Sequence, residues 1–333
     1  MPSEPSRPDA PPAPGSRPPW SRLLFNTQGV VLLAVAVLWL AIGLTESRFV
    51  SGENIQNIMQ QMAIKGVIGI GAVIVILTGG IDLSVGSVVG FVNVLFALMV
   101  TKETGLPVPA ALALVLVLSA AIGLVNGVMV HDLRLPPFIA TLGMMTVLRG
   151  ATLLVTKSRN VFDLPRSLSE FANTYHLYVP DLFWILVGVV ICTEILLRRT
   201  HFGRYIYALG SNREAARLTG VNTRLVTYGV YMLGAFLGGV AGAMETARQW
   251  MGVPTTGTMY ELDAIAVAVL GGASLGGAEG TAFGAFIGAL LMTTIYNGAV
   301  LLGINPNFTM VLVGLILIVT VAADQLRKRR SGG

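Results

Sequence analysis

Two carboxylates, Asp82 and Glu194, combine an ionisable group with a position inside or beside an apolar stretch of this sequence. Asp82 lies in LTGGIDLSVGSVVG (77–90), where it can bind a proton or a cation, or can cap the helix that follows by accepting from a backbone amide. No second carboxylate lies nearby in sequence, so capping is the preferred interpretation. Glu194 precedes Arg198 by four residues, a spacing that predicts a helix ion pair.

Other catalytic chemistry is not indicated by the residues. A single cysteine, Cys192, and three scattered histidines offer neither a disulfide nor a metal-ligand cluster. No nucleophile stands at helical spacing from a base, so we expect no catalytic residue, no metal site and no cofactor in this chain. The pattern G-x-x-x-x-G-K-S/T does not occur. If ATP drives this protein, another chain must bind the nucleotide.

The composition indicates a membrane protein. Of 333 residues, 12% are charged and 54% are hydrophobic, whereas soluble proteins carry roughly 25% charged residues. This balance excludes a soluble globular enzyme. The net charge of +5 comes from basic residues that flank apolar stretches, so it implies no nucleic-acid partner.

Ten apolar stretches predict an all-α, polytopic transmembrane helical bundle of about ten spans, within a transmembrane domain over residues 26–325. The predicted spans are 26–45, 58–79, 86–101, 109–130, 137–156, 182–197, 225–244, 263–278, 281–300 and 308–323. Residues 1–25 are predicted to be a disordered tail, because the first 20 hold eight of the sixteen prolines. A secretory signal peptide is the alternative, but the apolar run begins only near Val30 and leads straight into further spans.

The distribution of basic residues predicts the orientation. With both termini in the cytoplasm, the inner side holds 14 of the 22 lysines and arginines: three in the N-terminal tail, one between spans four and five, six in 198–224 and four in the basic tail 326–333. This asymmetry fits the positive-inside rule. We therefore expect a soluble partner at the inner segment 198–224.

Glycine spacing indicates close helix packing and an interruption. Gly234, Gly238 and Gly242 recur every fourth residue, which lets helix backbones approach. The series from Gly272 to Gly288 cannot keep one face on a straight helix, so a break is predicted near 276–280. Residues 270–284 resemble 77–90 about 192 residues earlier, which suggests two faintly related halves.

The segment ALGSNREAARLTGVN (208–222) predicts a short helix that docks a partner. Ser211 and Glu214 have the spacing of a capping box, and Gly220 suits a C-terminal cap. A two-turn helix is marginal alone, so specified ends favour a docking role over a solvated turn. Ala215, Ala216 and Leu218 are expected to form an apolar patch, with Arg213 and Arg217 beside it to meet carboxylates.

Polar residues inside the spans are the candidates for a transport path, although helix-to-helix hydrogen bonds are their commoner use. They are Asn57, Gln60, Gln61, Asp82, Ser84, Asn93, Asn126, Thr141, Thr146, Tyr296 and Asn297. Arg149 is too costly to leave in lipid, so it either snorkels outward or is paired within the bundle.

Four motifs carry a family resemblance: GGIDLSVGS (79–87), FIATLGMM (138–145), GRYIYALGSNREAARLTGVN (203–222) and YELDAIAVAVLGGASLGGAEG (260–280). In this order they resemble the ribose-type permease subunits of bacterial ABC sugar importers, a family of ribose, xylose, arabinose and galactose permeases. The resemblance covers residues 50 to 325. The chain differs in its long proline-rich tail and in Glu279, where relatives often have a basic or neutral residue.

The resemblance implies a multi-pass subunit of the bacterial inner membrane that moves a monosaccharide, such as ribose, by alternating access. Its implied partners are a second permease copy in a homodimer or heterodimer, two cytoplasmic ATP-binding subunits that bind ATP and Mg, an extracytoplasmic sugar-binding protein, and membrane lipid. It also implies a coupling helix that contacts the ATPase, formed by Gly210, Ser211, Asn212, Arg213, Glu214, Ala215, Ala216, Arg217, Leu218, Thr219 and Gly220.

Alternatives differ in cargo or in energy source. Another sugar, a polyol, a furanosyl signal or a branched-chain amino acid are the other cargoes, the last disfavoured by GGIDLSVGS. An ion-coupled secondary transporter predicts paired acids inside spans, whereas an ATP-driven permease predicts an inner docking helix and few buried carboxylates. The sequence favours the ATP-driven permease.

Overall fold

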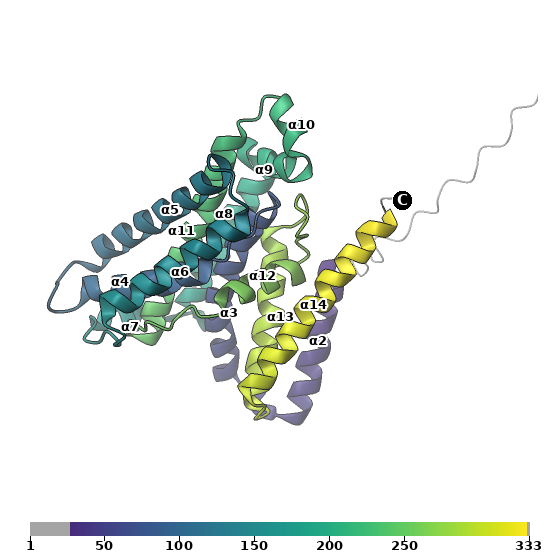
Figure 1. Ribbon diagram of the computed structural model, residues 1–333. Coiled ribbons are helices and arrows are strands. Elements are labelled where there is room, and N and C mark those ends of the chain that lie inside the picture. Colours follow the sequence, from purple (N-terminus) through teal and green to yellow (C-terminus); the bar gives the residue numbers. More distant parts are fainter. Residues whose placement is uncertain (1–26, 332–333) are drawn as a thin grey trace, which may run out of the picture.

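The computed structural model describes residues 27–331 as a bundle of helices (Figure 1). Each of the ten predicted spans contains a helix, and the all-α prediction is confirmed. These helices are α2 (Thr27–Thr45), α3 (Gly52–Ile76), α4 (Val85–Val100), α5 (Val108–His131), α6 (Pro137–Thr156), α8 (Asp181–Arg199), α11 (Thr223–Gln249), α12 (Tyr260–Leu270), α13 (Ala282–Leu301) and α14 (Pro306–Ser331). The last of them, α14, continues through most of the predicted basic tail 326–333. The predicted tail 1–25 lies outside the described residues.

Short elements fill the connections. They are η1 (Ser47–Val50), α7 (Arg166–Ala172), α9 (His201–Ser211) and α10 (Arg213–Leu218), together with a hairpin of β1 (Tyr175–His176) and β2 (Val179–Pro180). The two strands pair antiparallel in the loop between α7 and α8 and were not predicted from the sequence. In Figure 1, α9 and α10 lie at the same end of the bundle as the C-terminal end of α14.

One predicted span is wrong as a continuous crossing. Within the described residues, six helices are long and apolar enough to span a membrane: α2, α3, α5, α6, α11 and α13. By contrast, α12 has 11 residues and is therefore about 16 Å long, roughly half the thickness of the hydrocarbon core. The predicted span 263–278 thus contains a half-length helix, followed by an interruption at 271–281 that includes the predicted break.

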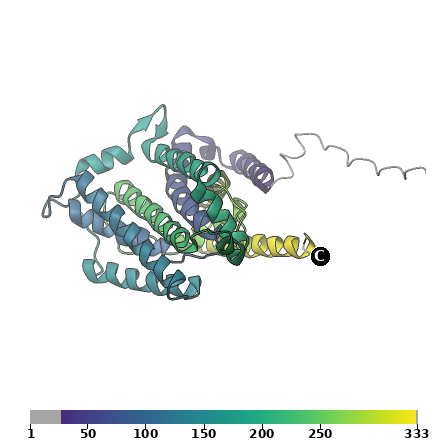
Figure 2. The ribbon, with the colours of Figure 1, turned by 90° about the horizontal axis from the view of Figure 1, so that it is seen from above.

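The centre of the bundle is α11, which packs against α3, α4 and α5 (Figures 1 and 2). The three glycines spaced four apart lie on this packed surface. A Cβ atom at Gly242 would lie 2.9 Å from the Cβ of Val92 on α4, and one at Gly234 would lie 3.0 Å from a methyl carbon of Val75 on α3. The predicted packing role of these glycines, with Gly238 between them, is confirmed.

The two interruptions have the same local geometry. Gly79 after α3 and Gly272 after α12 both adopt positive φ, 74° and 92°. In each case the amide of the next residue donates to the carbonyl five residues back, at 3.3 and 2.9 Å, which ends the helix in a Schellman motif. The equivalent glycines are 193 residues apart, so the sequence alignment at 192 is wrong by one residue. The shared geometry supports two related halves.

Candidate functional site

Three segments that are distant in sequence meet at one place, which we call the loop junction (residues 77–84, 207–210 and 274–280). The amide of Ala278 donates to the carbonyl of Leu77 at 2.9 Å and so joins the two interruptions. Gly210, near the end of α9, lies over the same contact. A Cβ atom there would lie 1.8 Å from the Leu77 carbonyl oxygen and 2.8 Å from the Ala278 nitrogen. Only glycine fits at this position.

A second bond links α9 to the junction. The hydroxyl of Tyr207 donates to the carbonyl of Gly280 at 2.8 Å. The end of α9 therefore touches both interruptions, and α10 follows it after one residue. A displacement of α10 must act on α9 and, through it, on both places where the membrane helices are broken.

The N-terminal cap of α10 differs from the prediction. Asn212, with extended backbone, accepts from the amide of Ala215 at 2.9 Å, whereas Ser211 is the last residue of α9. Glu214 does not reach back as a capping box requires. It pairs instead with Arg217 at 2.6 Å, and this hydrogen bond lowers the pKa of the Glu214 carboxyl.

The C-terminal end of α10 follows the prediction, and its apolar patch is smaller than predicted. Gly220 adopts φ 87° and ends the helix. Ala216 is only 4% exposed because it packs toward the protein, whereas Leu218 is 74% exposed and Ala215 is also exposed. The patch available to a partner therefore consists of Ala215 and Leu218.

A polar cleft of about 1070 Å³ lies between α10 and the connection from α5 to α6. Its charged lining consists of four arginines, two carboxylates and a histidine: Arg134, Arg213, Arg217, Arg224, Asp132, Glu214 and His131. The hydroxyl of Tyr228, then His131 and Arg224, lower the pKa of Asp132 to about 2. Both carboxylates are thus ionised and paired near neutral pH, and the cleft keeps a positive excess that suits an acidic partner surface.

Four of the predicted path residues cluster beside the loop junction. Asp82 accepts from the amide of Ser84 at 2.7 Å, as predicted, but the N-cap of α4 is Ser84 itself and no described side chain caps that helix. The Ser84 hydroxyl donates to Asp82 at 2.6 Å and accepts from Asn126 at 2.9 Å, while Thr141 accepts from the amide of Leu83 at 3.1 Å. In the described part of the chain, one oxygen each of Asp82 and Asn126 is buried without a partner.

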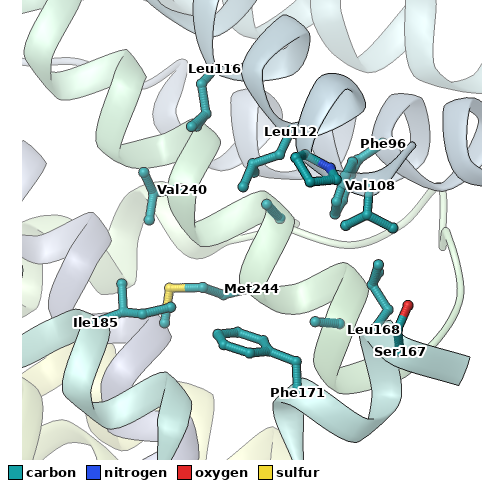
Figure 3. Close-up of a pocket in the computed structure, with 13 residues that line it drawn as sticks. Phe96, Val108, Leu112, Leu116, Ser167, Leu168, Phe171, Ile185, Val240 and Met244 are labelled. Carbon is teal, nitrogen blue, oxygen red and sulfur yellow. The ribbon is translucent and has the colours of Figure 1, made fainter. Parts of the chain in front are cut away.

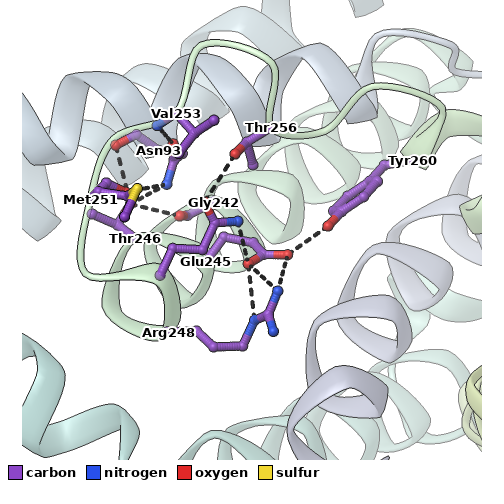
Figure 4. Close-up of polar contacts among 10 residues, drawn as sticks. Asn93, Gly242, Glu245, Thr246, Arg248, Met251, Val253, Thr256 and Tyr260 are labelled. Carbon is purple, nitrogen blue, oxygen red and sulfur yellow. Dashed lines mark hydrogen bonds and ion pairs between the residues drawn. The ribbon is translucent and has the colours of Figure 1, made fainter. Parts of the chain in front are cut away.

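The other predicted path residues lie apart, and most of them bond within the protein. Asn93 bonds Thr246, and Asn297 bonds Asn54 at 2.9 Å. Figure 4 shows Asn93 beside the irregular segment that follows α11. Gln60 bonds the carbonyl of Ala172, and Thr146 bonds its own helix. Asn93 and Asn297 therefore serve as hydrogen-bond links between helices, which is the commoner use of polar residues inside spans.

Among the described residues, two predicted path residues on α3 have no hydrogen-bond partner. Asn57 is exposed and Gln61 is half-buried. They stand four residues apart, and Lys65 follows four residues later, so the three share one helix face. This face leads from the start of α3 toward a charged cluster.

That cluster was not predicted from the sequence. We call it the ion cluster (Lys65, Glu245, Arg248, Tyr260, Asp263 and Tyr296). Lys65 Nζ lies 2.9 Å from an Asp263 oxygen and 3.4 Å from the centre of the Tyr296 ring. The Tyr296 hydroxyl donates to Asp263 at 2.9 Å. Tyr296 was a predicted path residue, and its ionic partners come from α3 and α12, far away in sequence.

The second half of the ion cluster surrounds Glu245, which is 1% exposed (Figure 4). It accepts from Tyr260 at 2.6 Å, from Gln249 at 3.0 Å and from Arg248 at 3.1 Å. Two carboxylates and two cations balance to zero net charge, as an ion group at membrane depth requires. The sequence signal was the spacing of three between Glu245 and Arg248, which lie just beyond the predicted span 225–244.

Arg149 is paired within the bundle, which is one of its two predicted alternatives. Its guanidinium donates to the carbonyls of Thr256 at 2.9 Å and of Gly257 at 3.1 Å. The same irregular segment, 250–259, donates from Val253 to Asn93 at 2.7 Å. These side chains satisfy non-helical backbone that runs along α4, which is how such backbone survives at membrane depth.

Comparison with known proteins identifies the family. A family model described as "Branched-chain amino acid transport system / permease component" matches residues 54–321. The chain belongs to this permease family. The permease is 38% identical over 304 residues to the ribose import permease protein RbsC of Escherichia coli, covering 89% of this chain and 93% of the relative. No solved structure matches it.

Two further relatives cover a similar share. The permease is 37% identical to RbsC of Bacillus subtilis over 295 residues, covering 88% of this chain and 91% of the relative. It is 35% identical to the autoinducer 2 import system permease protein LsrC of Salmonella choleraesuis over 299 residues, covering 90% and 86%. The permease is therefore a multi-pass membrane transport subunit. The matched region includes the loop junction, α10 and the ion cluster.

A cavity of about 410 Å³ in the permease does not suit a sugar (Figure 3). It lies among α4, α5, α7, α8 and α11, and its lining includes Phe96, Leu112, Phe171 and Met244. Ser167 is the one lining residue with a polar side chain. Sugar hydroxyls need several convergent polar partners, so this cavity is not the transport path.

Proposed function

We propose that the permease is the membrane subunit of an ATP-driven importer that carries a monosaccharide, with ribose as its cargo, across the bacterial inner membrane. Relatives that cover most of the chain are named ribose import permeases. One structural observation supports the ATP-driven mechanism most directly: α10 is a capped helix at one end of the bundle that presents Leu218 outward.

In this proposal α10, with the flanking residues 210–220, is the coupling helix of the ATPase partner. When ATP binding moves the partner, α10 and α9 move as one unit because a single residue separates them. Gly210 and Tyr207 then transmit that movement to both helix interruptions. The permease thus alternates between outward-open and inward-open arrangements of its two halves.

The proposed complex has several further components. Two cytoplasmic ATP-binding subunits bind ATP and Mg, a second permease copy completes the membrane unit, and an extracytoplasmic binding protein delivers the sugar. Both termini are cytoplasmic, on the same side as α10. The positive excess in the cleft beside α10 supports docking of an acidic surface of the ATPase.

The proposed path begins on the face of α3 that carries Asn57 and Gln61 and continues toward the ion cluster. Amide groups and the rings of Tyr260 and Tyr296 suit sugar hydroxyls and apolar sugar faces. The carboxylates Asp263 and Glu245 are each paired with a cation, so they offer no free site for a coupling ion.

Leu218→Glu is expected to abolish co-purification of the ATP-binding subunit, because it places a charge on the exposed apolar residue of α10. The permease itself should insert and fold normally, since Leu218 makes little contact with its own protein. Leu177→Glu is the matched control: Leu177 is 86% exposed in the hairpin between α7 and α8 and should not affect the association. Equal co-purification of the Leu218 variant and the wild type would exclude α10 as the docking element.

The cargo is tested by competition. Proteoliposomes containing the permease, its ATPase and its binding protein should take up labelled ribose, and excess unlabelled ribose should suppress the signal. Excess leucine should leave uptake unchanged. If leucine suppressed the uptake of labelled ribose, or if a furanosyl signal suppressed it more strongly than unlabelled ribose does, that competitor and not ribose would be the cargo.

A further inference from the structure

A groove runs between α8 and α11 on the side of the bundle where both helices pack over α3. The groove has a volume of about 420 Å³, and Ile74 of α3 forms its floor. From α8 it is lined by Ile185, Cys192 and Leu196, and from α11 by Leu233 and Phe236. Cys192 is exposed, so the groove opens outward.

The lining selects hydrocarbon over sugar or water. No side chain that lines it carries a charge, and only Cys192 and Thr193 carry a polar atom. A water or a sugar in such a place would lack hydrogen-bond partners, whereas an acyl chain loses nothing by entering it. One wall of the groove is α11, which is long and apolar enough to span a membrane, so acyl chains are the solvent expected beside it.

The length of the groove matches one leaflet of the bilayer. Ile185 and Leu196 are eleven residues apart, which on a helix is about 16 Å. Half of the hydrocarbon core is about 15 Å thick. One extended acyl chain of a single leaflet therefore fills the groove from end to end.

A cation stands where the headgroup of such a lipid would lie. Arg199, the last residue of α8, follows Leu196 by three residues and so continues the same helix face beyond the groove. Its neighbour Arg198 is paired with Glu194, whereas Arg199 is exposed and has no hydrogen bond or ion pair with any described residue. Arginine is well suited to bind a phosphate group through several donors.

We infer that the groove between α8 and α11 is a binding site for an anionic phospholipid, with one acyl chain between the helices and its phosphate at Arg199. The lipid would fill the gap between α8 and the central helix α11 and so support the packing of α8. In the orientation proposed above, Arg199 lies on the cytoplasmic side, which places this lipid in the cytoplasmic leaflet. Only that placement rests on the proposed function. Lipid binding itself can be measured without transport.

Native mass spectrometry of the full-length permease, released from vesicles of equal phosphatidylglycerol and phosphatidylcholine, tests the headgroup. The retained lipid should be enriched in phosphatidylglycerol by about fivefold, the preference expected for one arginine at the membrane surface. Arg199→Gln should remove the enrichment, and Arg166→Gln, the same change on α7, should keep it. Equal retention of both lipids by the wild type would overturn the proposal.

Gly188→Leu tests the acyl-chain position. A Cβ atom at Gly188 meets no atom within 4 Å, so leucine fills the groove without a clash and should reduce retention of both lipids. Gly150→Leu on α6 also has open space around it and should retain them. Phosphatidylglycerol with a photoreactive acyl chain should crosslink to α8 and α11. Oxidative crosslinking of Cys192 between two copies would instead show a second permease in the groove and overturn the proposal.

Discussion

Gly210→Val is expected to reduce sugar transport strongly while the ATPase remains bound. The valine Cβ would lie 1.8 Å from the Leu77 carbonyl oxygen, so α9 must move away from both helix interruptions. We expect uptake in proteoliposomes to fall by about ten- to a hundredfold, the range of typical coupling energies. Co-purification of the ATPase should persist because the exposed residues of α10 are unchanged. ATP hydrolysis would then proceed without transport.

The control for this prediction is Gly150→Val on α6, where a Cβ atom meets nothing within 4 Å. This variant has the same change of residue type inside a helix and should transport at close to the wild-type rate. Wild-type transport by the Gly210 variant would show that contact between α9 and the interruptions is not needed for coupling. Loss of ATPase binding would show instead that Gly210 serves α10 itself.

Lys65→Met is expected to destabilise the permease strongly. It removes the cation that lies 2.9 Å from Asp263 and leaves a carboxylate buried at membrane depth without a cationic partner. Breaking a buried ion pair on one side costs about 3 to 5 kcal/mol. The free energy of unfolding in mixed micelles should fall by that amount, and the apparent melting temperature should fall with it.

A second substitution shows whether the lost stability comes from the missing Lys65–Asp263 contact or from the carboxylate that is left unpaired. In the double variant Lys65→Met with Asp263→Asn, no charge remains at the pair and the amide oxygen still accepts from the Tyr296 hydroxyl. Most of the lost stability should return, because the penalty comes from the orphaned carboxylate. Stability losses that simply add in the double variant would mean that the pair does not act as a unit.

The sequence predicted the helices well where local chemistry decides their ends. The boundaries of α6 match the prediction at 137–156, because Pro136 and Pro137 begin the helix and Lys157 ends it in a left-handed conformation. The short length of α12 was not predicted. Its alanines and valines are buried in protein rather than facing lipid, and hydropathy does not distinguish these environments.

The candidate site was only partly predictable. Ser211 and Asn212 are both good capping residues, and the structure continues α9 through Ser211 and leaves the cap of α10 to Asn212. The ion cluster depends on Lys65 meeting Asp263 across 198 positions of sequence, which no spacing rule reveals. The hydrogen bond of Asp82 was predicted correctly because its partner, Ser84, is two residues away.

If an ATPase partner powers this permease through α10, ribose uptake must consume ATP. Ribose uptake should be measured in proteoliposomes that contain the permease, its ATPase and its binding protein, with and without ATP and with and without an ionophore. Uptake should require ATP and be insensitive to the ionophore. Uptake that persists without nucleotide and collapses with the ionophore would show an ion-coupled transporter instead.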